Sequence, residues 1–302
     1  MSTETVICTE RLTKHYKRRI AVDNLSLEVR RGEVFGFLGP NGAGKTTTIL
    51  MLLNLVKPTS GRALVLGHNV QQNPVTALRR VGAMIEAPAF YPYLSGRDNL
   101  RVLARADGLS DARITPALAA VELESRARDR FGSYSQGMKQ RLAIAATLLA
   151  DPELIILDEP TNGLDPAGTV EIRALIRSLA EGGRTIFLCS HLLHEVEQVC
   201  QRVAILKEGR MVAEGRVEQL LRRGQGIQVR VASEPTQALA LLRAIPWVSA
   251  VEQCGDMLLI DAPNNRAPEI NALLAHDGVL VAEMRAREAS LEEFFLEVTG
   301  AS

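Results

Sequence analysis

A glycine-rich stretch at residues 39–47 limits what this chain can fold into more than any other part of the sequence. It consists of Gly39, Pro40, Asn41, Gly42, Ala43, Gly44, Lys45, Thr46 and Thr47. The apolar run 34–38 before it indicates a buried parallel strand, and the apolar run 48–55 after it indicates a buried helix. A strand, a glycine-rich turn and the start of a helix form the context that a phosphate-binding loop requires.

The chemistry of this stretch suits a nucleoside triphosphate. Glycines let backbone N–H groups approach phosphate oxygens without a Cβ in the way, and the helix N-terminus adds unpaired N–H groups and a partial positive charge. Lys45 is expected to reach the β and γ phosphates, and the Thr46 hydroxyl to ligate Mg²⁺. The alternative, a glycine turn beside a stray lysine, does not account for the flanking strand and helix. We therefore predict that the chain binds a nucleoside triphosphate.

Two carboxylates end a second apolar run, residues 154–157. In open parallel sheets, ligands gather at the carboxyl ends of strands. Asp158 at such an end suits a water-mediated contact to Mg²⁺, and Glu159 suits a general base that positions the attacking water. Structural carboxylates are common at strand ends, but the phosphate-binding loop upstream favours the catalytic interpretation.

Further candidates are ambiguous when each is taken alone. Ser135 and Gly137 precede a predicted helix, where they could form an anion site or, for Ser135, a simple N-cap. His191 follows the buried strand 185–188 and is either structural or a donor to the γ-phosphate. Tyr16 lies in the basic turn 14–19 of a predicted antiparallel meander, where an aromatic ring could stack on a base. The basic residues of that turn are expected to be solvated.

Length and pattern divide the chain into two parts. With 302 residues it is long enough for about two domains. A polar stretch near 220–226 marks the boundary, so we predict a nucleotide-binding domain over residues 1–220 and an accessory α+β domain over 221–302. The second part has a βαββαβα pattern that fits a small ferredoxin-like sandwich.

Composition excludes several classes of function. Lys+Arg and Asp+Glu number 35 each, so the formal net charge is zero. The overall charge therefore does not indicate nucleic acid or an anionic membrane surface as a partner. No apolar run approaches the ~20 residues of a membrane-spanning helix, and the first residues lack the features of a signal peptide. The four cysteines lie far apart without metal-ligand spacing, which indicates reduced cytosolic thiols. If the protein works at a membrane, another chain must supply the spans.

Together these motifs resemble the ATP-binding subunit of an ABC transporter, over about residues 4–218. The loop matches the Walker A motif and residues 154–159 match Walker B. Ser135 and Gly137 match the signature, and residues 162–165 match the D-loop that ends in Asp165. His191 matches the switch histidine and Tyr16 the adenine-stacking aromatic. The tail at residues 290–300 is similar to subunits of bacitracin, lantibiotic or anthracycline resistance exporters.

This resemblance implies an α/β fold of the ABC type, with a parallel-sheet core, an antiparallel β subdomain and a helical subdomain. It implies ATP hydrolysis with Mg²⁺ in a head-to-tail homodimer, in which Ser135 and Gly137 of one subunit cap ATP on the other. Asp165 joins the nucleotide contacts. It also implies a separate transmembrane permease, reached through the loop 86–93, and a cytoplasmic position on the inner face of the membrane.

The sequence departs from the family's motifs at two places, and three alternative functions are considered beside the exporter subunit. The signature lacks its first glycine and its glutamine, and Glu86 replaces the glutamine that the family uses as a Mg²⁺ ligand. Glu86 is therefore either a charged Mg²⁺ ligand or a solvent-facing loop residue. A soluble ABC ATPase acting on ribosomes or DNA usually has two cassettes or a long insertion, which this sequence lacks. Export of a lipid or an ion, and a ligand-binding regulatory role for the C-terminal domain, remain open.

Overall fold

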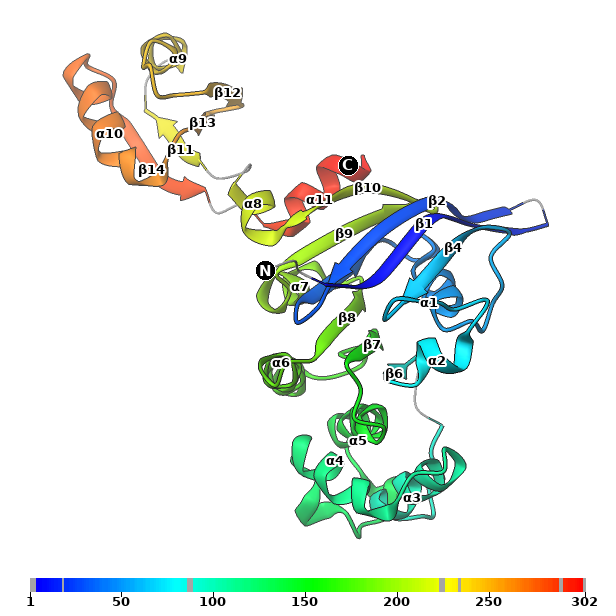
Figure 1. Cartoon of the computed structure of the whole chain (residues 1–302). Coiled ribbons are helices and arrows are strands. Elements are labelled where there is room, and N and C mark those ends of the chain that lie inside the picture. Colours follow the sequence, from blue (N-terminus) through cyan, green and yellow to red (C-terminus); the bar gives the residue numbers. More distant parts are fainter. Residues whose placement is uncertain are drawn as a thin grey trace. The chain divides into compact units, whose positions relative to one another are not determined.

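The computed structural model describes residues 4–17, 19–85, 89–222, 226–232, 235–287 and 290–300 (Figure 1). Glu86, the predicted Mg²⁺ ligand, lies outside these residues. The chain divides into two compact units, Met1–Gly215 and Arg216–Ser302. This division falls a few residues before the boundary that the sequence predicts.

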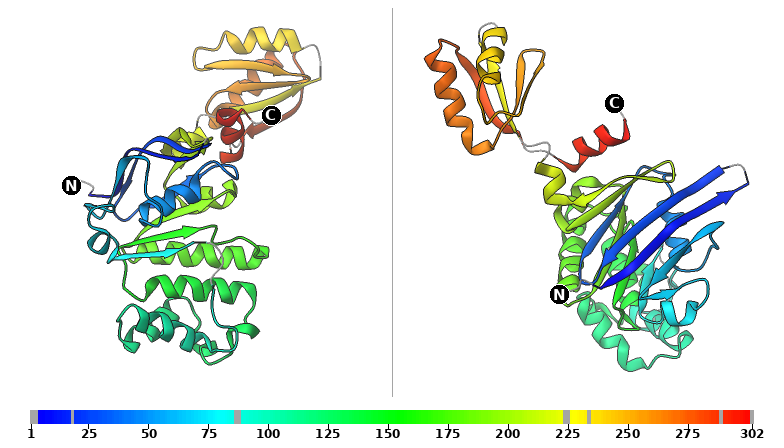
Figure 2. Two further views of the ribbon diagram at one scale, coloured as in Figure 1. Left: turned by 90° about the vertical axis from the view of Figure 1, so that its right-hand side faces the viewer. Right: turned by 45° about the horizontal axis from the view of Figure 1, so that its top comes forward.

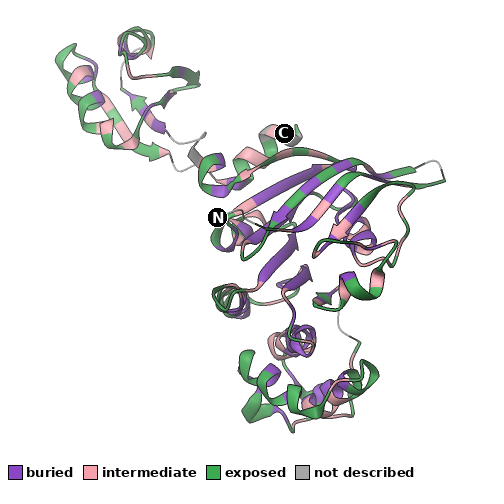
Figure 3. Cartoon of the chain, viewed as in Figure 1, coloured by how far each residue is buried: buried purple, intermediate pink, exposed green. Residues whose placement is uncertain are grey.

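A six-stranded sheet of order β10-β9-β3-β8-β7-β6 forms the centre of the first unit. Its strands are β3 (Val34–Leu38), β6 (Val81–Met84), β7 (Leu154–Asp158), β8 (Thr185–Ser190), β9 (Arg202–Lys207) and β10 (Arg210–Arg216). β8 pairs in parallel with both β3 and β7. Every residue of these three strands is buried, which explains their continuous apolar sequences (Figure 3).

A four-stranded antiparallel sheet packs beside it, with β1 (Thr5–Tyr16), β2 (Arg19–Arg30), β4 (Ser60–Val65) and β5 (His68–Asn69) in the order β2-β1-β4-β5. The predicted meander is confirmed, but its two long strands reach Tyr16 and Arg19, so the turn is shorter than expected. Apolar side chains of both sheets and of α1 (Lys45–Leu52) share one core. Within it Phe187 contacts Phe35 and Phe37, with ring centroids 5.9 and 5.2 Å apart.

Helices complete the first unit. They are α2 (Pro74–Leu78), α3 (Gly96–Ala106), α4 (Ile114–Ala120), α5 (Gln136–Leu148), α6 (Pro166–Glu181) and α7 (Leu193–Val199), with short 3-10 turns at Asp111–Arg113, Glu124–Arg126 and Phe131–Ser133. Figure 1 places α5 between the parallel sheet and helices α3 and α4, and Figure 2 shows this layering from two other sides. The helical pattern 95–130 is interrupted because Gly108 takes φ 67°, a conformation that ends α3.

The second unit begins with α8 (Val217–Arg222) and continues through β11 (Gly226–Val231), α9 (Pro235–Arg243), β12 (Ala250–Cys254), β13 (Met257–Asp261), α10 (Ala267–His276), β14 (Val281–Arg287) and α11 (Leu291–Thr299). The predicted βαββαβα order from β11 to α11 is confirmed. The sheet, of order β12-β13-β11-β14, is antiparallel throughout. Helices α9 and α10 cover the face that carries Ile227 and Val229.

Among the described residues, no helix combines the length and the apolar character needed to cross a bilayer. All four cysteines are free thiols, in agreement with the expectation from their spacing.

Because each unit has its own apolar core, the first should fold alone. We predict that a chain truncated after Arg216, at the end of β10, unfolds cooperatively and binds ATP with the affinity of the full chain. Circular dichroism during heating and titration with a fluorescent ATP analogue measure the two properties. A truncated chain that folds but does not bind ATP would show that the second unit completes the site.

Candidate nucleotide-binding site

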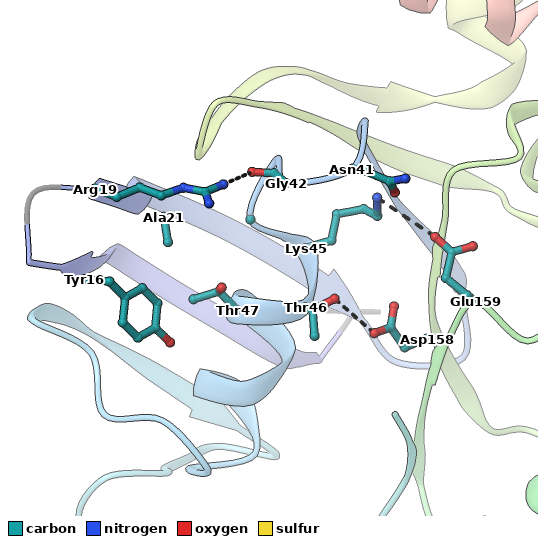
Figure 4. Close-up of a pocket in the computed structure, with 11 residues that line it drawn as sticks. Tyr16, Arg19, Ala21, Asn41, Gly42, Lys45, Thr46, Thr47, Asp158 and Glu159 are labelled. Atoms are coloured by element: carbon teal, nitrogen blue, oxygen red, sulfur yellow. Dashed lines mark hydrogen bonds and ion pairs between the residues drawn. The ribbon is translucent and has the colours of Figure 1, made fainter. Parts of the chain in front are cut away.

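A pocket of about 410 Å³ lies where the glycine-rich loop meets the carboxyl end of β7 (Figure 4). It is lined by Tyr16, Arg19, Ala21, Asn41, Gly42, Gly44, Lys45, Thr46, Thr47, Asp158 and Glu159. The sequence predicted all of these except Arg19 and Ala21. Of the predicted loop residues, Gly39, Pro40 and Ala43 do not line the pocket, and each instead supports the loop through its backbone.

The loop is held in shape by backbone contacts to β2 and to the β9–β10 turn. Gly44 has φ 107°, and a Cβ placed there would lie 2.4 Å from the carbonyl oxygen of Ala21. The N–H of Gly209 donates to the carbonyl of Ala43 at 2.9 Å, and the N–H of Asp23 donates to the carbonyl of Gly209 at 2.8 Å. The turn at Gly209 therefore joins the loop to β2.

Lys45 is a buried cation with only 6% of its surface exposed. Its Nζ donates to the carbonyl oxygens of Gly39 at 2.6 Å and Pro40 at 3.3 Å. The same Nζ lies 4.0 Å from Oε1 of Glu159. A buried charge requires such partners, and here they hold the ammonium group between the loop and the end of β7.

Thr46 and Asp158 bring two hard oxygen donors together. Thr46 Oγ1 donates to Asp158 Oδ2 at 3.2 Å. Mg²⁺ at phosphate sites takes few protein ligands and completes its shell with waters and phosphate oxygens. Among the described residues no cluster of three or more His, Cys, Asp or Glu side chains could hold a metal, so a full protein cage is absent there. The pair fits Mg²⁺ bound together with a nucleotide.

Glu159 follows β7 in a strained backbone conformation, with φ 51°. Its N–H donates to the carbonyl of Cys189 at 2.9 Å. Its Oε2 lies 2.8 Å from Nδ1 of His191, and the backbone N–H of His191 donates to the same oxygen at 3.4 Å. The parallel pairing of β7 with β8 thus places the two predicted catalytic residues in contact, although His191 does not itself line the pocket. Such strain is common at functional sites.

Cys189 lies beside these residues but cannot act as a nucleophile at neutral pH. Burial, together with the nearby negative charge of Asp158, raises the pKa of its thiol well above the usual range. The thiol therefore stays protonated inside β8.

Tyr16 and Arg19 face the pocket from the ends of β1 and β2. The Tyr16 ring is 44% exposed, and the Lys14 Nζ lies 5.0 Å from its centroid. The Arg19 guanidinium donates from Nη2 to the carbonyl of Gly42 at 3.3 Å. Arg19 is exposed, as predicted for the basic residues of this turn, but it also makes this contact with the loop. The sequence holds no signal that separates Arg19 from the other basic residues of this turn, because its position depends on the pairing of β1 with β2.

Ser135, Gly137 and Asp165 lie apart from this pocket. Ser135 Oγ accepts the N–H of Met138 at 3.2 Å and caps α5, as the N-cap alternative predicted. Asp165 Oδ1 accepts the N–H of Gly168 at 2.9 Å and caps α6. Both side chains are exposed, and neither they nor Gly137 lines the pocket. A nucleotide role for these three residues stays a prediction.

Comparison with known proteins identifies the class. The ABC transporter family model matches residues 22–162. The bacitracin transport ATP-binding protein BcrA of Bacillus licheniformis is 40% identical over 98% of this chain and 98% of that protein. The Nod factor export ATP-binding protein I of Cupriavidus metallidurans is 38% identical over 95% of both. The daunorubicin resistance ATP-binding protein DrrA3 of Streptomyces coeruleorubidus is 34% identical over 98% of this chain and 96% of that protein.

This chain belongs to the ABC transporter ATP-binding proteins, a family of ATPases. The resemblance drawn from its motifs is confirmed, including the exporter branch. A dimeric ATP-binding cassette, solved in a post-hydrolysis state with ADP and Pi, matches at 25% identity and a TM-score of 0.62. The match covers 70% of this chain and 98% of that one, which confirms the predicted fold class of the cassette.

The close approach of Gly44 to β2 leads to a stability prediction. We expect Gly44→Ala to lower the free energy of unfolding by about 2 kcal/mol more than Gly67→Ala, because both residues have positive φ but only Gly44 meets backbone. A Cβ at Gly67, at φ 80°, meets nothing within 4 Å, so this variant measures the conformational strain alone. Urea unfolding without nucleotide measures the free energy of unfolding of both variants and of the parent. Equal losses would contradict the proposed close packing.

Proposed function

We propose that this ATPase is the motor subunit of an exporter whose separate transmembrane permease carries an antibiotic, drug or peptide. The observation that supports it best is the 40% identity to the bacitracin transport protein along 98% of both chains, since it extends beyond the cassette into the C-terminal unit. The permease would supply the membrane spans and hold this chain at the cytoplasmic face of the membrane.

The pocket residues suggest how ATP is held. The face of the Tyr16 ring away from Lys14 is available to stack on adenine. The backbone N–H groups of residues 44–47 and the Lys45 ammonium group would bind the phosphates. Thr46, directly, and Asp158, through water, would hold Mg²⁺. Whether Glu86 adds a Mg²⁺ ligand stays a prediction.

Glu159 is the proposed general base. ATP binding would bring the phosphates to Lys45, which now lies 4.0 Å from the Glu159 carboxylate. Glu159 would then be free to orient a water for attack, while its 2.8 Å contact with His191 holds the carboxylate in place. His191 is proposed to sense or stabilise the γ-phosphate from the end of β8.

A homodimer explains why the signature residues lie apart from their own pocket. Ser135, Gly137 and Asp165 sit at the starts of α5 and α6, where helix N-termini can bind an anion. We propose that they cap ATP held by a second copy. The solved cassette with ADP and Pi is a dimer, which supports this arrangement.

The loop after β6 is the proposed contact to the permease. Tyr91 and Tyr93 expose 48% and 68% of their surface, and aromatic side chains are enriched at protein interfaces. Buried Asn99 fixes the loop, because its side chain exchanges two hydrogen bonds with the backbone of Tyr91. Phe90 packs on Phe131 with ring centroids 5.1 Å apart. The loop is therefore attached to the segment that leads into the signature.

The relatives are named for bacitracin, daunorubicin and Nod factor, which differ in chemistry. The Nod factor relative, at 38% identity, supports the second candidate, export of a cargo that is not a drug.

We predict that Lys45→Ala removes most ATP binding and, with it, drug resistance. Losing charge-assisted hydrogen bonds to phosphate should weaken ATP affinity by about ten- to a hundredfold. Cells that produce this chain together with its permease should tolerate more bacitracin, and Lys45→Ala should remove this gain. Lys57→Ala, which changes an exposed lysine away from the pocket, is the matched control. Resistance that survives Lys45→Ala would refute the proposed role of ATP.

We predict that Glu159→Gln retains ATP binding but slows hydrolysis by about 10²–10⁴-fold, the usual contribution of a general base. Because the closed dimer should persist until hydrolysis, this variant should elute as a dimer with ATP on size exclusion. Adding Ser135→Arg should restore the monomer by blocking the cap on the partner's ATP. Glu159→Gln that stays monomeric at saturating ATP would count against the dimer model.

A further inference from the structure

Arg19 lines the nucleotide pocket, although none of the motifs assigns it a role. It begins β2 directly opposite Tyr16 in the β1–β2 register. Its Nη2 donates to the carbonyl oxygen of Gly42 at 3.3 Å, from the outer rim of the phosphate-binding loop. In Figure 4 its side chain extends along the upper side of the pocket, from the region of Tyr16 toward Gly42.

Gly42 also lies close to the Arg19 guanidinium. Gly42 has φ 81°, and a Cβ placed there would lie 3.2 Å from Arg19 Nη2. A side chain at this position would require the guanidinium to shift by a few tenths of an ångström.

The charge of Arg19 is free to act on a ligand. No described carboxylate forms an ion pair with it, whereas Arg202, in the same unit, is paired with both Glu33 and Glu214. A guanidinium has five N–H donors, and the bond to Gly42 uses one of them. The pocket otherwise holds one cation, Lys45, beside two carboxylates, so a polyanionic nucleotide would benefit from a second positive group.

We propose that Arg19 binds the phosphate chain of the nucleotide at its ribose end. Tyr16 marks one end of the pocket, and Lys45 with Glu159 marks the other (Figure 4). Arg19 reaches Gly42 from the Tyr16 side, so its remaining donors face the phosphate nearest the ribose. ATP and ADP share this phosphate. The inference rests on nucleotide binding in this pocket, and it makes Arg19 a determinant of affinity for both nucleotides.

Affinity measurements on three variants test this placement. Arg19→Gln should weaken binding of Mg²⁺-ATP and of ADP by the same factor, about tenfold, the effect of losing one charge-assisted hydrogen bond. Arg19→Lys, which keeps the charge without the planar fork, should lose less. Arg30→Gln removes the same charge from the exposed far end of the same strand and should bind like the parent. Because Arg19 is exposed, its contribution should also shrink as salt rises.

Isothermal titration with each nucleotide, and thermal unfolding without nucleotide, give the readouts. Unchanged unfolding with equal losses of ATP and ADP affinity supports the proposal. If Arg19→Gln binds both nucleotides within twofold of Arg30→Gln, Arg19 is only a surface residue of the hairpin. A loss for ATP alone would overturn its placement at the ribose end. A parent chain that bound neither nucleotide would instead count against the pocket as a whole, so the two failures are distinguishable.

Discussion

Parallel pairing of β8 with both β3 and β7 is the constraint on which the site depends. Its register places Leu38 beside Ser190 and Asp158 beside Cys189, so all three strands end at one edge of the sheet. The glycine-rich loop follows β3, Asp158 is the last residue of β7 and Glu159 follows it, and His191 follows β8. Thr46 and Asp158 are 112 positions apart in sequence, yet they hydrogen-bond because the strands before them share this edge. Catalytic geometry is here a consequence of strand order.

The loop is also supported by elements other than strands β3, β7 and β8. The antiparallel sheet contributes the backbone at Ala21, and the β9–β10 turn contributes Gly209, whose N–H donates to the carbonyl of Ala43. The loop N–H groups that are proposed to bind phosphate lie on a backbone that is already held in place. Lys45 donates to the loop carbonyls of Gly39 and Pro40, and neighbouring strands contact the loop from outside. Binding then requires little rearrangement of the loop, which favours affinity because less conformational entropy is lost.

Sequence reasoning succeeded where the chemistry is local and failed where it depends on neighbouring elements. Residues 39–47 and the carboxylates Asp158 and Glu159 were predictable, since each sits at a strand end that its own sequence defines. Arg19 was not, because its place in the pocket follows from the pairing of β1 with β2 and from the contact with Gly42. The signature residues were placed correctly at a helix start. The surface proposed to meet them belongs to a second copy of the chain, which reasoning on one sequence could reach only through the family resemblance.

The aromatic contacts around Phe131 have a consequence for how such subunits can be exchanged. Phe131 touches both Phe90 of the loop after β6 and Tyr134, whose hydroxyl donates to the carbonyl of Arg126 at 2.8 Å. A Cβ at Gly96 would lie 2.2 Å from that hydroxyl oxygen, so α3 also packs directly against it. The loop, the start of α3 and the approach to α5 therefore form a single module. A loop transplanted from a related subunit, to fit it to a different permease, would work only if these side chains were transplanted with it.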